Sequence, residues 1–261
     1  MRWLLLVLLV SLVRSKAGEG QRCVKPDDCG RGLTCDADAL QCITAKTLAC
    51  RKSKNCSNFG LCTAKDGKCQ ATKDSDCAQS EMSGNWGLRT AKGGKCQATK
   101  DSDCANSGGC DKAGLCIAKD GECQATQDSD CASAWVCATF GHCTAKNGKC
   151  QATKDTHCAN AEQGCTQEGL CTAKDGKCQA TKDSDCAKSV YAGWGLRTAK
   201  HGKCQATKDS DCSKSEVCTK HGHCTAKGGM CQATKDLDCA TSEWCTSAGH
   251  CSAKKGVCVK R

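Results

Sequence analysis

Cysteine is the residue type with the greatest chemical potential in this chain, because thiolates bind metals and thiol pairs form disulfides. The chain has 261 residues, of which 32 are cysteine. At least five residues separate any two cysteines, whereas zinc sites use closer pairs such as C-x2–4-C. This cysteine density is typical of a secreted disulfide scaffold. We therefore expect disulfides and no metal or cofactor.

Paired aspartates are the second chemical feature. They occur in six copies: Asp74/Asp76, Asp101/Asp103, Asp128/Asp130, Asp183/Asp185, Asp209/Asp211 and Asp236/Asp238. A calcium site needs six to eight oxygen ligands, but mostly Lys, Ser or Ala follows each pair. Helix capping is the stronger interpretation, with weak calcium binding as the alternative.

The histidines suggest no catalytic centre. They are His142, His157, His201, His221, His223 and His250. Three of them, His142, His223 and His250, occupy a repeat position where other copies have Leu61, Leu115 or Leu170. No general base stands beside a positioned nucleophile, and no phosphate-binding glycine loop is present in the sequence. We expect a protein without enzymatic activity and with no catalytic residues.

The N-terminal segment reads as a secretory signal peptide over residues 1–17. Arg2 precedes the apolar run Trp3–Val13, and Ser15-Lys16-Ala17 fits a small-x-small cleavage site. The run is shorter than the roughly 20 residues that span a membrane. We expect a secreted, extracellular protein without a membrane span. The net charge is +10, but Lys and Asp alternate, so no single-sign run predicts nucleic-acid binding.

The rest of the chain is nine tandem repeats. Each repeat has cysteines a, b, c and d in the pattern a-x5-b-x5-c-x6-d, with seven residues before the next a. Repeat 6 has one extra residue, and repeats 3 and 7 lack both b and c. The nine repeats span residues 23–42, 50–69, 77–96, 104–123, 131–150, 158–178, 186–204, 212–231 and 239–258.

The joint loss of b and c predicts how the cysteines pair. If b bonds to c, then a bonds to d, and every repeat keeps an even number of cysteines. The expected a–d disulfides join Cys23 to Cys42, Cys50 to Cys69, Cys77 to Cys96, Cys104 to Cys123, Cys131 to Cys150, Cys158 to Cys178, Cys186 to Cys204, Cys212 to Cys231 and Cys239 to Cys258. The expected b–c disulfides join Cys29 to Cys35, Cys56 to Cys62, Cys110 to Cys116, Cys137 to Cys143, Cys165 to Cys171, Cys218 to Cys224 and Cys245 to Cys251.

Turn residues predict the fold of one repeat. Dipeptides such as Asp66-Gly67 and Asn147-Gly148 favour a two-residue hairpin turn, which would place Lys65 opposite Lys68 and Ala64 opposite Cys69. The Asp-Ser-Asp segment before a predicts a short capped helical turn. We expect small disulfide-rich tandem repeats, each a short helical turn plus a β-hairpin, in an elongated array. Seven large rings after the leader are too few for one large core.

Three groups of residues are candidates for binding. Repeats 3 and 7 share a W-G-L-R-T-A-K segment that offers Trp86, Arg89, Trp194 and Arg197, types enriched at binding hot spots. A decayed, duplicated repeat is the alternative explanation. Asn55-Cys56-Ser57 matches a glycosylation sequon. A recurring lysine row faces either solvent or acidic glycans and mineral: Lys73, Lys100, Lys154, Lys182, Lys208 and Lys235.

The pattern D-x-D-C-x-x-S-x-x-C-x-x-x-G-x-C-x-x-x-x-G-x-C runs from Asp209 to Cys231. It resembles tandem cysteine repeats in predicted exported proteins of myxobacteria and some protists, which implies an extracellular repeat protein and no catalytic residue. The leading expectation is a structural, surface-coat or adhesive role through multivalent binding. Its partner would be an extracellular protein, a glycan or matrix, with self-association possible. The alternatives are a secreted effector with one protein target, such as a protease inhibitor or toxin-like factor, and extracellular metal sequestration.

Overall fold

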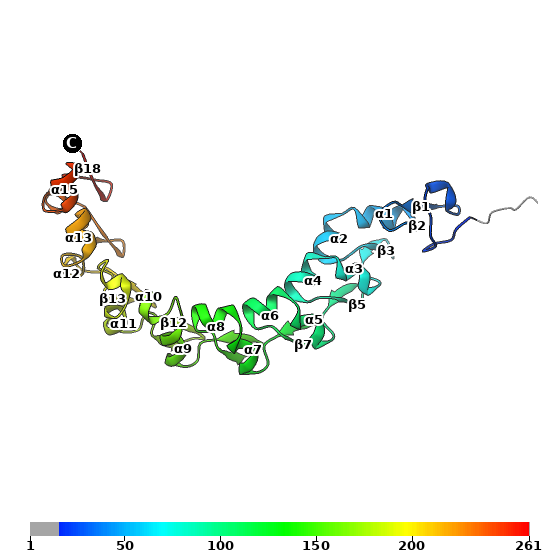
Figure 1. Cartoon of the computed structure of the whole chain (residues 1–261), viewed down its shortest axis with the longest axis horizontal. Helices are drawn as coiled ribbons and strands as arrows, with labels where there is room; N and C mark the ends of the chain where they lie inside the picture. The colour runs from blue at the N-terminus through cyan, green and yellow to red at the C-terminus, as the bar shows by residue number, and fades with distance from the viewer. Residues whose placement is uncertain (1–15, 261) are drawn as a thin grey trace, which may run out of the picture. The chain divides into compact units, whose positions relative to one another are not determined.

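A computed structural model describes residues 16–260 (Figure 1). The expected signal peptide therefore lies outside the described residues, except for Lys16 and Ala17. Ala17 pairs with the first repeat, because its N–H donates to the Asp28 carbonyl and its carbonyl accepts from the Gly30 N–H. Within the described residues, no helix is long and apolar enough to cross a membrane.

Repeats 2 to 9 share one order of elements: two short helical segments and then a hairpin. The first helices are α1 (Ala45–Arg51), α3 (Asp74–Ala78), α5 (Asp101–Ala105), α7 (Asp128–Ala132), α9 (Asp155–Asn160), α11 (Asp183–Ala187), α12 (Asp209–Cys212) and α14 (Asp236–Ala240). The second segments are α2 (Lys54–Phe59), α4 (Glu81–Trp86), α6 (Gly108–Ala113), α8 (Trp135–Phe140), α10 (Cys165–Glu168), the 3-10 helix η2 (Val190–Ala192), α13 (Glu216–His221) and α15 (Glu243–Ala248). The predicted tandem disulfide-rich repeats of short helix plus β-hairpin are confirmed, and the second helix is an addition to the prediction.

The hairpins follow in the same order along the chain. They are β3–β4 (Thr63–Lys65, Lys68–Gln70), β5–β6 (Thr90–Lys92, Lys95–Gln97), β7–β8 (Ile117–Lys119, Glu122–Gln124), β9–β10 (Thr144–Lys146, Lys149–Gln151), β11–β12 (Thr172–Lys174, Lys177–Gln179), β13–β14 (Thr198–Lys200, Lys203–Gln205), β15–β16 (Thr225–Lys227, Met230–Gln232) and β17–β18 (Ser252–Lys254, Val257–Val259). The register is the predicted one: Lys65 faces Lys68 and Ala64 faces Cys69. Asp66 and Gly67 both have positive φ, as a type I′ turn requires.

The second helix has its own start and stop signals. Ser215 lies immediately before α13, and its hydroxyl accepts from the Cys218 N–H at 3.2 Å. Gly222 then ends the helix in the left-handed region, with φ 73°. Ser53, Ser107 and Ser242 cap other second helices in the same way. A serine three residues before b and a glycine two residues before c therefore delimit this helix.

All 32 cysteines lie within the described residues, and all are in disulfides. Repeats 2 to 9 have the a–d bond, and six of them add the b–c bond. Closing the 20-residue a–d loop contributes about 3 kcal/mol in the chain-entropy model, and the shorter b–c loop about 2 kcal/mol. Repeats 3 and 7 lack only the smaller contribution.

Repeat 1 corrects the pairing prediction. Its bonds are Cys23–Cys35 and Cys29–Cys42, so a bonds to c and b to d. The predicted bonds Cys23–Cys42 and Cys29–Cys35 are wrong. The cause is the hairpin β1–β2 (Leu33–Asp36, Gln41–Thr44), whose strands flank a four-residue loop and place Cys35 directly opposite Cys42. The two sulfurs therefore project from one face to different partners on the preceding loop, which holds η1 (Pro26–Asp28).

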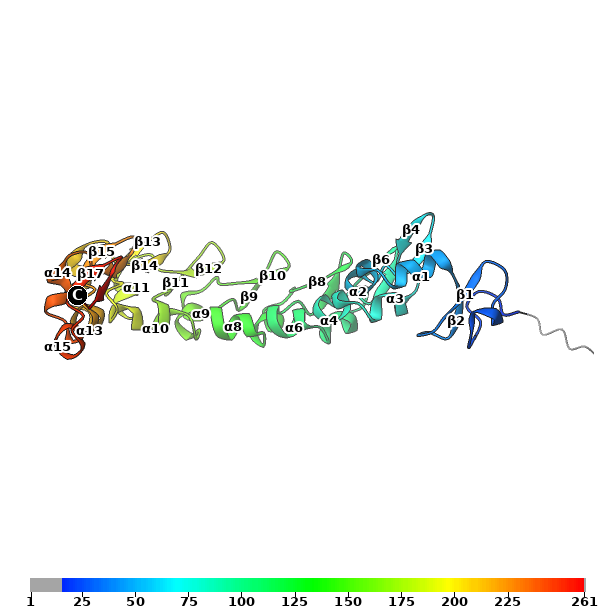
Figure 2. The same cartoon turned by 90° about the horizontal axis from the view of Figure 1, so that it is seen from above.

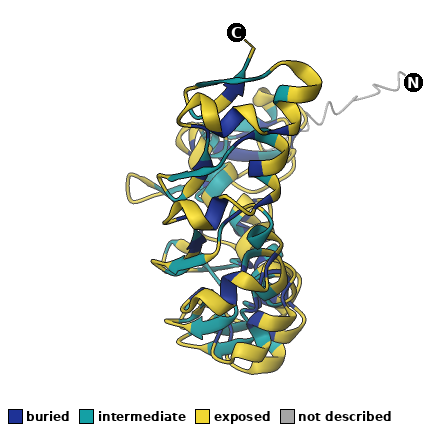
Figure 3. Ribbon diagram, turned by 90° about the vertical axis from the view of Figure 1, so that its left-hand side faces the viewer, coloured by how far each residue is buried: buried dark blue, intermediate teal, exposed yellow. Residues whose placement is uncertain are grey.

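Cysteines and small residues form the interior instead of large side chains. The a cysteines of repeats 3 to 9 are fully buried, and an alanine two residues after d, such as Ala71 or Ala98, is 2% exposed. The buried residues form short separate segments along the described chain (Figure 3). Each of repeats 2 to 9 thus has its own small core around the a–d disulfide, and the core of repeat 1 surrounds its two crossed disulfides.

Neighbouring repeats contact each other through glycine. A Cβ on Gly60, at the end of α2, would lie 2.5 Å from Cys96 Sγ and 2.8 Å from the Asp76 carbonyl oxygen of the next repeat. Gly114 meets Cys150 and Asp130 in the same way. The backbone of one repeat therefore packs directly on the a–d disulfide of the next. Adjacent hairpins are joined by single backbone hydrogen bonds, such as that from the Ala125 N–H to the Gly148 carbonyl.

The chain divides into two compact parts. Among the described residues, the N-terminal part comprises residues 16–84 and 88–97, and the C-terminal part comprises residues 85–87 and 98–260. Repeat 1 begins the described portion of the N-terminal part and is followed by repeats 2 and 3. Within the C-terminal part, hairpins β7–β8, β9–β10 and β11–β12 lie along one side and helices α6, α8 and α10 along the other (Figure 2).

Candidate functional site

The aspartate pairs have structural roles. Asp76 is 5% exposed, and its Oδ2 accepts hydrogen bonds from the N–H groups of Thr72 and Lys73 at the start of α3. The same oxygen accepts from Thr63 Oγ1 of the preceding hairpin at 3.0 Å. Asp74 Oδ1 accepts from the Ala91 N–H of the following hairpin. One carboxylate therefore ties the helix to the hairpin before it, and the other ties it to the hairpin after it.

The cysteines offer no metal-binding thiolate, because every sulfur is bridged. The cluster of Cys23, Cys29 and Cys42 sulfurs arises from the two crossed disulfides of repeat 1. Sequestration of metal by thiolates would require reduction of the bonds that close the repeats.

Two histidines lie in partly apolar positions next to c. Burial lowers the pKa of His142, and the positive charge of Lys177 lowers it further. Burial also lowers the pKa of His223, with an additional effect from His221. The aromatic rings of His221 and Trp244 meet edge to face, with centroids 4.4 Å apart. The imidazoles of His142 and His223 are half-buried and favour the neutral form, because burial lowers the pKa of each.

Replacement of His142 and His223 by Leu should remove part of the loss of stability in acid. Their folded-state pKa values lie below the unfolded value of about 6.5, so protons bind preferentially to the unfolded chain as the pH falls. Each histidine then contributes a slope of at most about 1.4 kcal/mol per pH unit. Denaturant unfolding of H142L/H223L from pH 7.5 to 4.5, with disulfides intact, should show a shallower decline than the wild type.

The control for this prediction is H201N, which changes a histidine on an exposed hairpin turn. Asparagine suits that turn because Asn147 occupies the same position in repeat 5 at φ 52°. H201N should keep the wild-type pH profile. Identical acid profiles for H142L/H223L and the wild type would contradict the assignment.

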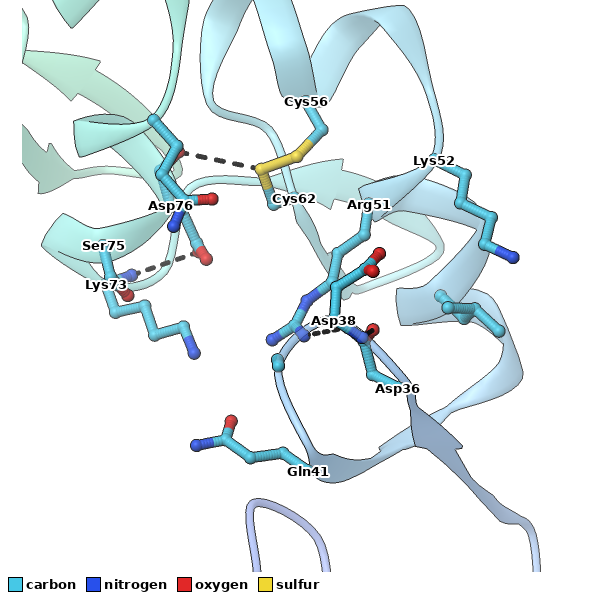
Figure 4. Close-up of a pocket in the computed structure, with 13 residues that line it drawn as sticks. Asp36, Asp38, Gln41, Arg51, Lys52, Cys56, Cys62, Lys73, Ser75 and Asp76 are labelled. Carbon is cyan, nitrogen blue, oxygen red and sulfur yellow. Dashed lines mark hydrogen bonds and ion pairs between the residues drawn. A yellow bond between two sulfur atoms is a disulfide. The ribbon is translucent and has the colours of Figure 1, made fainter. Parts of the chain in front are cut away.

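A polar cavity of about 420 Å³ lies in the N-terminal part, lined by repeats 1, 2 and 3 (Figure 4). Its most buried charge is Asp36, which is 4% exposed and accepts a hydrogen bond from Arg51. Burial by itself would raise the pKa of Asp36, but the Arg51 hydrogen bond and charge and the Asp38 N–H together hold it below its ordinary value. Cys56 and Cys62, which also line the cavity, are bonded to each other. Asp36 and Arg51 neutralise each other inside the cavity. The cavity lies at the junction of repeats 1, 2 and 3.

Three of the four predicted contact residues, Trp86, Trp194 and Arg197, are exposed, and Arg89 is half-buried. Trp194 is 50% exposed and stacks on Tyr191 with centroids 5.0 Å apart, and Arg197 Nε donates to the Ala192 carbonyl. Trp86 is 49% exposed at the end of α4. It belongs to the C-terminal part, whereas Arg89 belongs to the N-terminal part. All four described tryptophans lie in or shortly after a second helical segment, in repeats 3, 5, 7 and 9: Trp86, Trp135, Trp194 and Trp244. Each of these tryptophan rings is about half exposed and lies in a different repeat.

The recurring lysine row lies at the starts of the first helices. Lys73 and its counterparts are exposed, and each directly precedes an aspartate of the capping segment. In repeat 9, Lys235 Nζ approaches Asp238 Oδ1 at 4.0 Å. The carboxylates beside this row therefore offset its positive charge.

The strongest basic surface is one that the sequence analysis missed. Each hairpin tip consists of the two turn residues and the strand residue on either side, giving residues 65–68, 92–95, 119–122, 146–149, 174–177, 200–203, 227–230 and 254–257. These tips hold fourteen lysines and four acidic residues, a net charge of +10 that equals the charge of the entire chain. All fourteen lysines are exposed. The sequence contains a sign of this basic surface, because a lysine directly precedes the turn in all eight hairpins.

The sequon residue Asn55 is exposed on α2, and the middle residue of the sequon, Cys56, is bonded to Cys62. The Asn55 backbone carbonyl accepts from the Leu61 N–H. Glycosylation of Asn55 remains a prediction. In comparisons with known proteins, no family model matches the chain, and neither a curated protein nor a solved structure gives a significant match.

Proposed function

We propose that this chain is a secreted, non-enzymatic protein that binds an extracellular surface or matrix through many similar weak contacts. The observation that carries the proposal is the recurrence of one exposed hairpin tip on eight successive disulfide-closed repeats. Linked weak contacts raise the overall affinity because each contact increases the effective concentration of the next. Disulfides in every repeat support an oxidising, extracellular location.

Deletion of whole repeats tests the proposal. Removing residues 104–130 deletes four cysteines and restores the Asp-Ser-Asp-Cys junction, and removing residues 104–157 deletes two repeats. We expect each lost repeat to weaken binding to isolated extracellular matrix by a similar factor, on the order of tenfold, so the two-repeat deletion should bind more weakly than the one-repeat deletion. The secreted wild type should gain about 32 hydrogens on reduction, because its 32 cysteines form sixteen disulfides.

The alternative is an effector with a single protein target, and the exposed Trp194–Tyr191 stack favours this alternative most. W194A would then abolish binding, while both repeat deletions would leave it intact. That outcome would contradict multivalent binding.

A further inference from the structure

The hairpin tips place like charges opposite each other, which lowers the stability of the hairpins. Lysine faces lysine across the two strands in five of the eight tips: Lys65/Lys68, Lys92/Lys95, Lys146/Lys149, Lys174/Lys177 and Lys200/Lys203. Like charges directly opposite each other destabilise a strand pair, whereas opposite charges stabilise it by roughly 0.2–1 kcal/mol. Repeat 4 shows that the favourable arrangement fits, because Glu122 faces Lys119 there.

The structure leaves this charge unneutralised. Among the described residues, no ion pair within 4.0 Å involves a tip lysine. Asp66, Asp120 and Asp175 occupy first turn positions, where their positive φ suits an aspartate in a type I′ turn. Charge pairing in the folded protein therefore does not account for the lysines.

Neighbouring tips are held in a fixed order. The Gly148 carbonyl accepts from the Ala125 N–H, and the Gly176 carbonyl accepts from the Ala152 N–H, so the turn of each hairpin is tied to the strand end of the hairpin before it. Gln124 and Gln151 pack against these same glycines. In the C-terminal part, hairpins β7–β8, β9–β10 and β11–β12 follow one another along one edge (Figure 2), and each has an exposed lysine at its tip.

The chemistry of this edge selects the class of ligand. A series of exposed ammonium groups suits a long, linear polyanion, since each lysine acts as a point charge toward a sulfate or carboxylate. Proteins that hold single-stranded nucleic acid add aromatic rings on which bases stack, and none of the eight tips contains Phe, Tyr or Trp. An extracellular chain meets carboxylated and sulfated polysaccharides as its main linear polyanions.

We propose that the hairpin-tip edge binds an acidic polysaccharide, with each repeat contacting successive charged sugars through its tip lysines. This inference rests on the proposed multivalent function and names the ligand class and the residues that carry it. The lysine pairs explain why the tips tolerate local repulsion: the polysaccharide supplies the counter-charge.

The test uses the full chain with five lysine-to-glutamate changes at the tips. Each change creates the Lys–Glu pair already present in repeat 4, so the fold should be at least as stable as the wild type. The tip variant is K68E/K95E/K149E/K177E/K203E. Its matched control carries the same change in net charge at the exposed helix starts, away from the hairpin tips. The control variant is K73E/K100E/K154E/K182E/K208E.

Binding is measured on immobilised dextran sulfate and on alginate, which separate sulfate from carboxylate recognition, with uncharged dextran as a blank. We expect the wild type and the control variant to bind at least one of the two polyanions, and the tip variant to bind it at least about tenfold more weakly. Equal losses in both variants would show that net charge alone drives retention and would overturn the assignment.

Tighter wild-type binding to duplex DNA than to either polysaccharide would also overturn it. So would an absence of wild-type binding to both polyanions. In that last case, repeat-dependent binding to isolated matrix would still support the proposed function, so the two failures are distinguishable.

Discussion

Gly114→Ala should lower the free energy of unfolding of the C-terminal part by about 3 kcal/mol. The left-handed backbone of Gly114, at φ 69°, costs an L-residue about 1 kcal/mol. The new Cβ would also lie 2.5 Å from Cys150 Sγ and 2.7 Å from the Asp130 carbonyl oxygen, so repeats 4 and 5 must move apart. Overpacking of this kind costs a further 1–3 kcal/mol, roughly. Hydrogen exchange should show the loss of protection concentrated in repeats 4 and 5.

Gly249→Ala is the matched control. Gly249 ends α15 with nearly the same φ, 72°, but no heavy atom lies within 4 Å of the position that its Cβ would take. This variant should lose only the backbone contribution of about 1 kcal/mol. Equal destabilisation by the two substitutions would mean that glycine is needed for the helix end alone, and not for contact between repeats.

Asp211→Ala should destabilise the chain by about 2 kcal/mol, because it removes a buried carboxylate that accepts several hydrogen bonds. Its Oδ2 accepts from the Thr207 N–H at 2.9 Å and from Thr198 Oγ1 of the preceding hairpin at 3.0 Å. Loss of a helix cap costs about 0.5–2 kcal/mol, and hydrogen bonds to charged groups contribute about 1.5–3 kcal/mol. Denaturant unfolding with intact disulfides measures the change.

Two comparisons support the interpretation of that result. Asp209→Ala removes one exposed hydrogen bond, from the Ala226 N–H, and should cost less than half as much. Repeat 6 has His157 at the position of the buried aspartate, and its first helix lacks the cap. His157→Asp should therefore stabilise repeat 6 by about 1 kcal/mol. A neutral H157D together with a neutral D211A would show that this carboxylate contributes little to stability.

The local features were predictable because they depend on neighbouring residues. Two-residue turns such as Asp66-Gly67 determine the hairpin register, and the joint loss of b and c indicated the a–d bond found in repeats 2 to 9 and the b–c bond found in six of them. Repeat 1 has the same cysteine spacing but no turn glycine between c and d, and this difference was the available sign of its different pairing. Spacing alone does not specify which sulfurs face each other.

Features that depend on contact between repeats were not predictable. Gly60 reads as an ordinary helix end in the sequence, and only the packed structure shows the Cys96 sulfur beside it. The basic edge was missed for a related reason. The turn residues already placed Lys65 opposite Lys68, but only the structure shows that neighbouring hairpins are joined to each other, which brings their lysine pairs into one series.

Disulfide closure within each repeat has a consequence for how such a gene can change. A block of 27 residues from one a cysteine to the next, such as 104–130, contains both partners of every bond it holds. Unequal recombination between copies would therefore lengthen or shorten the protein without leaving an unpaired cysteine that could form a wrong disulfide. Array length becomes a heritable variable that selection can adjust independently of the fold, and alleles should differ by whole multiples of the repeat.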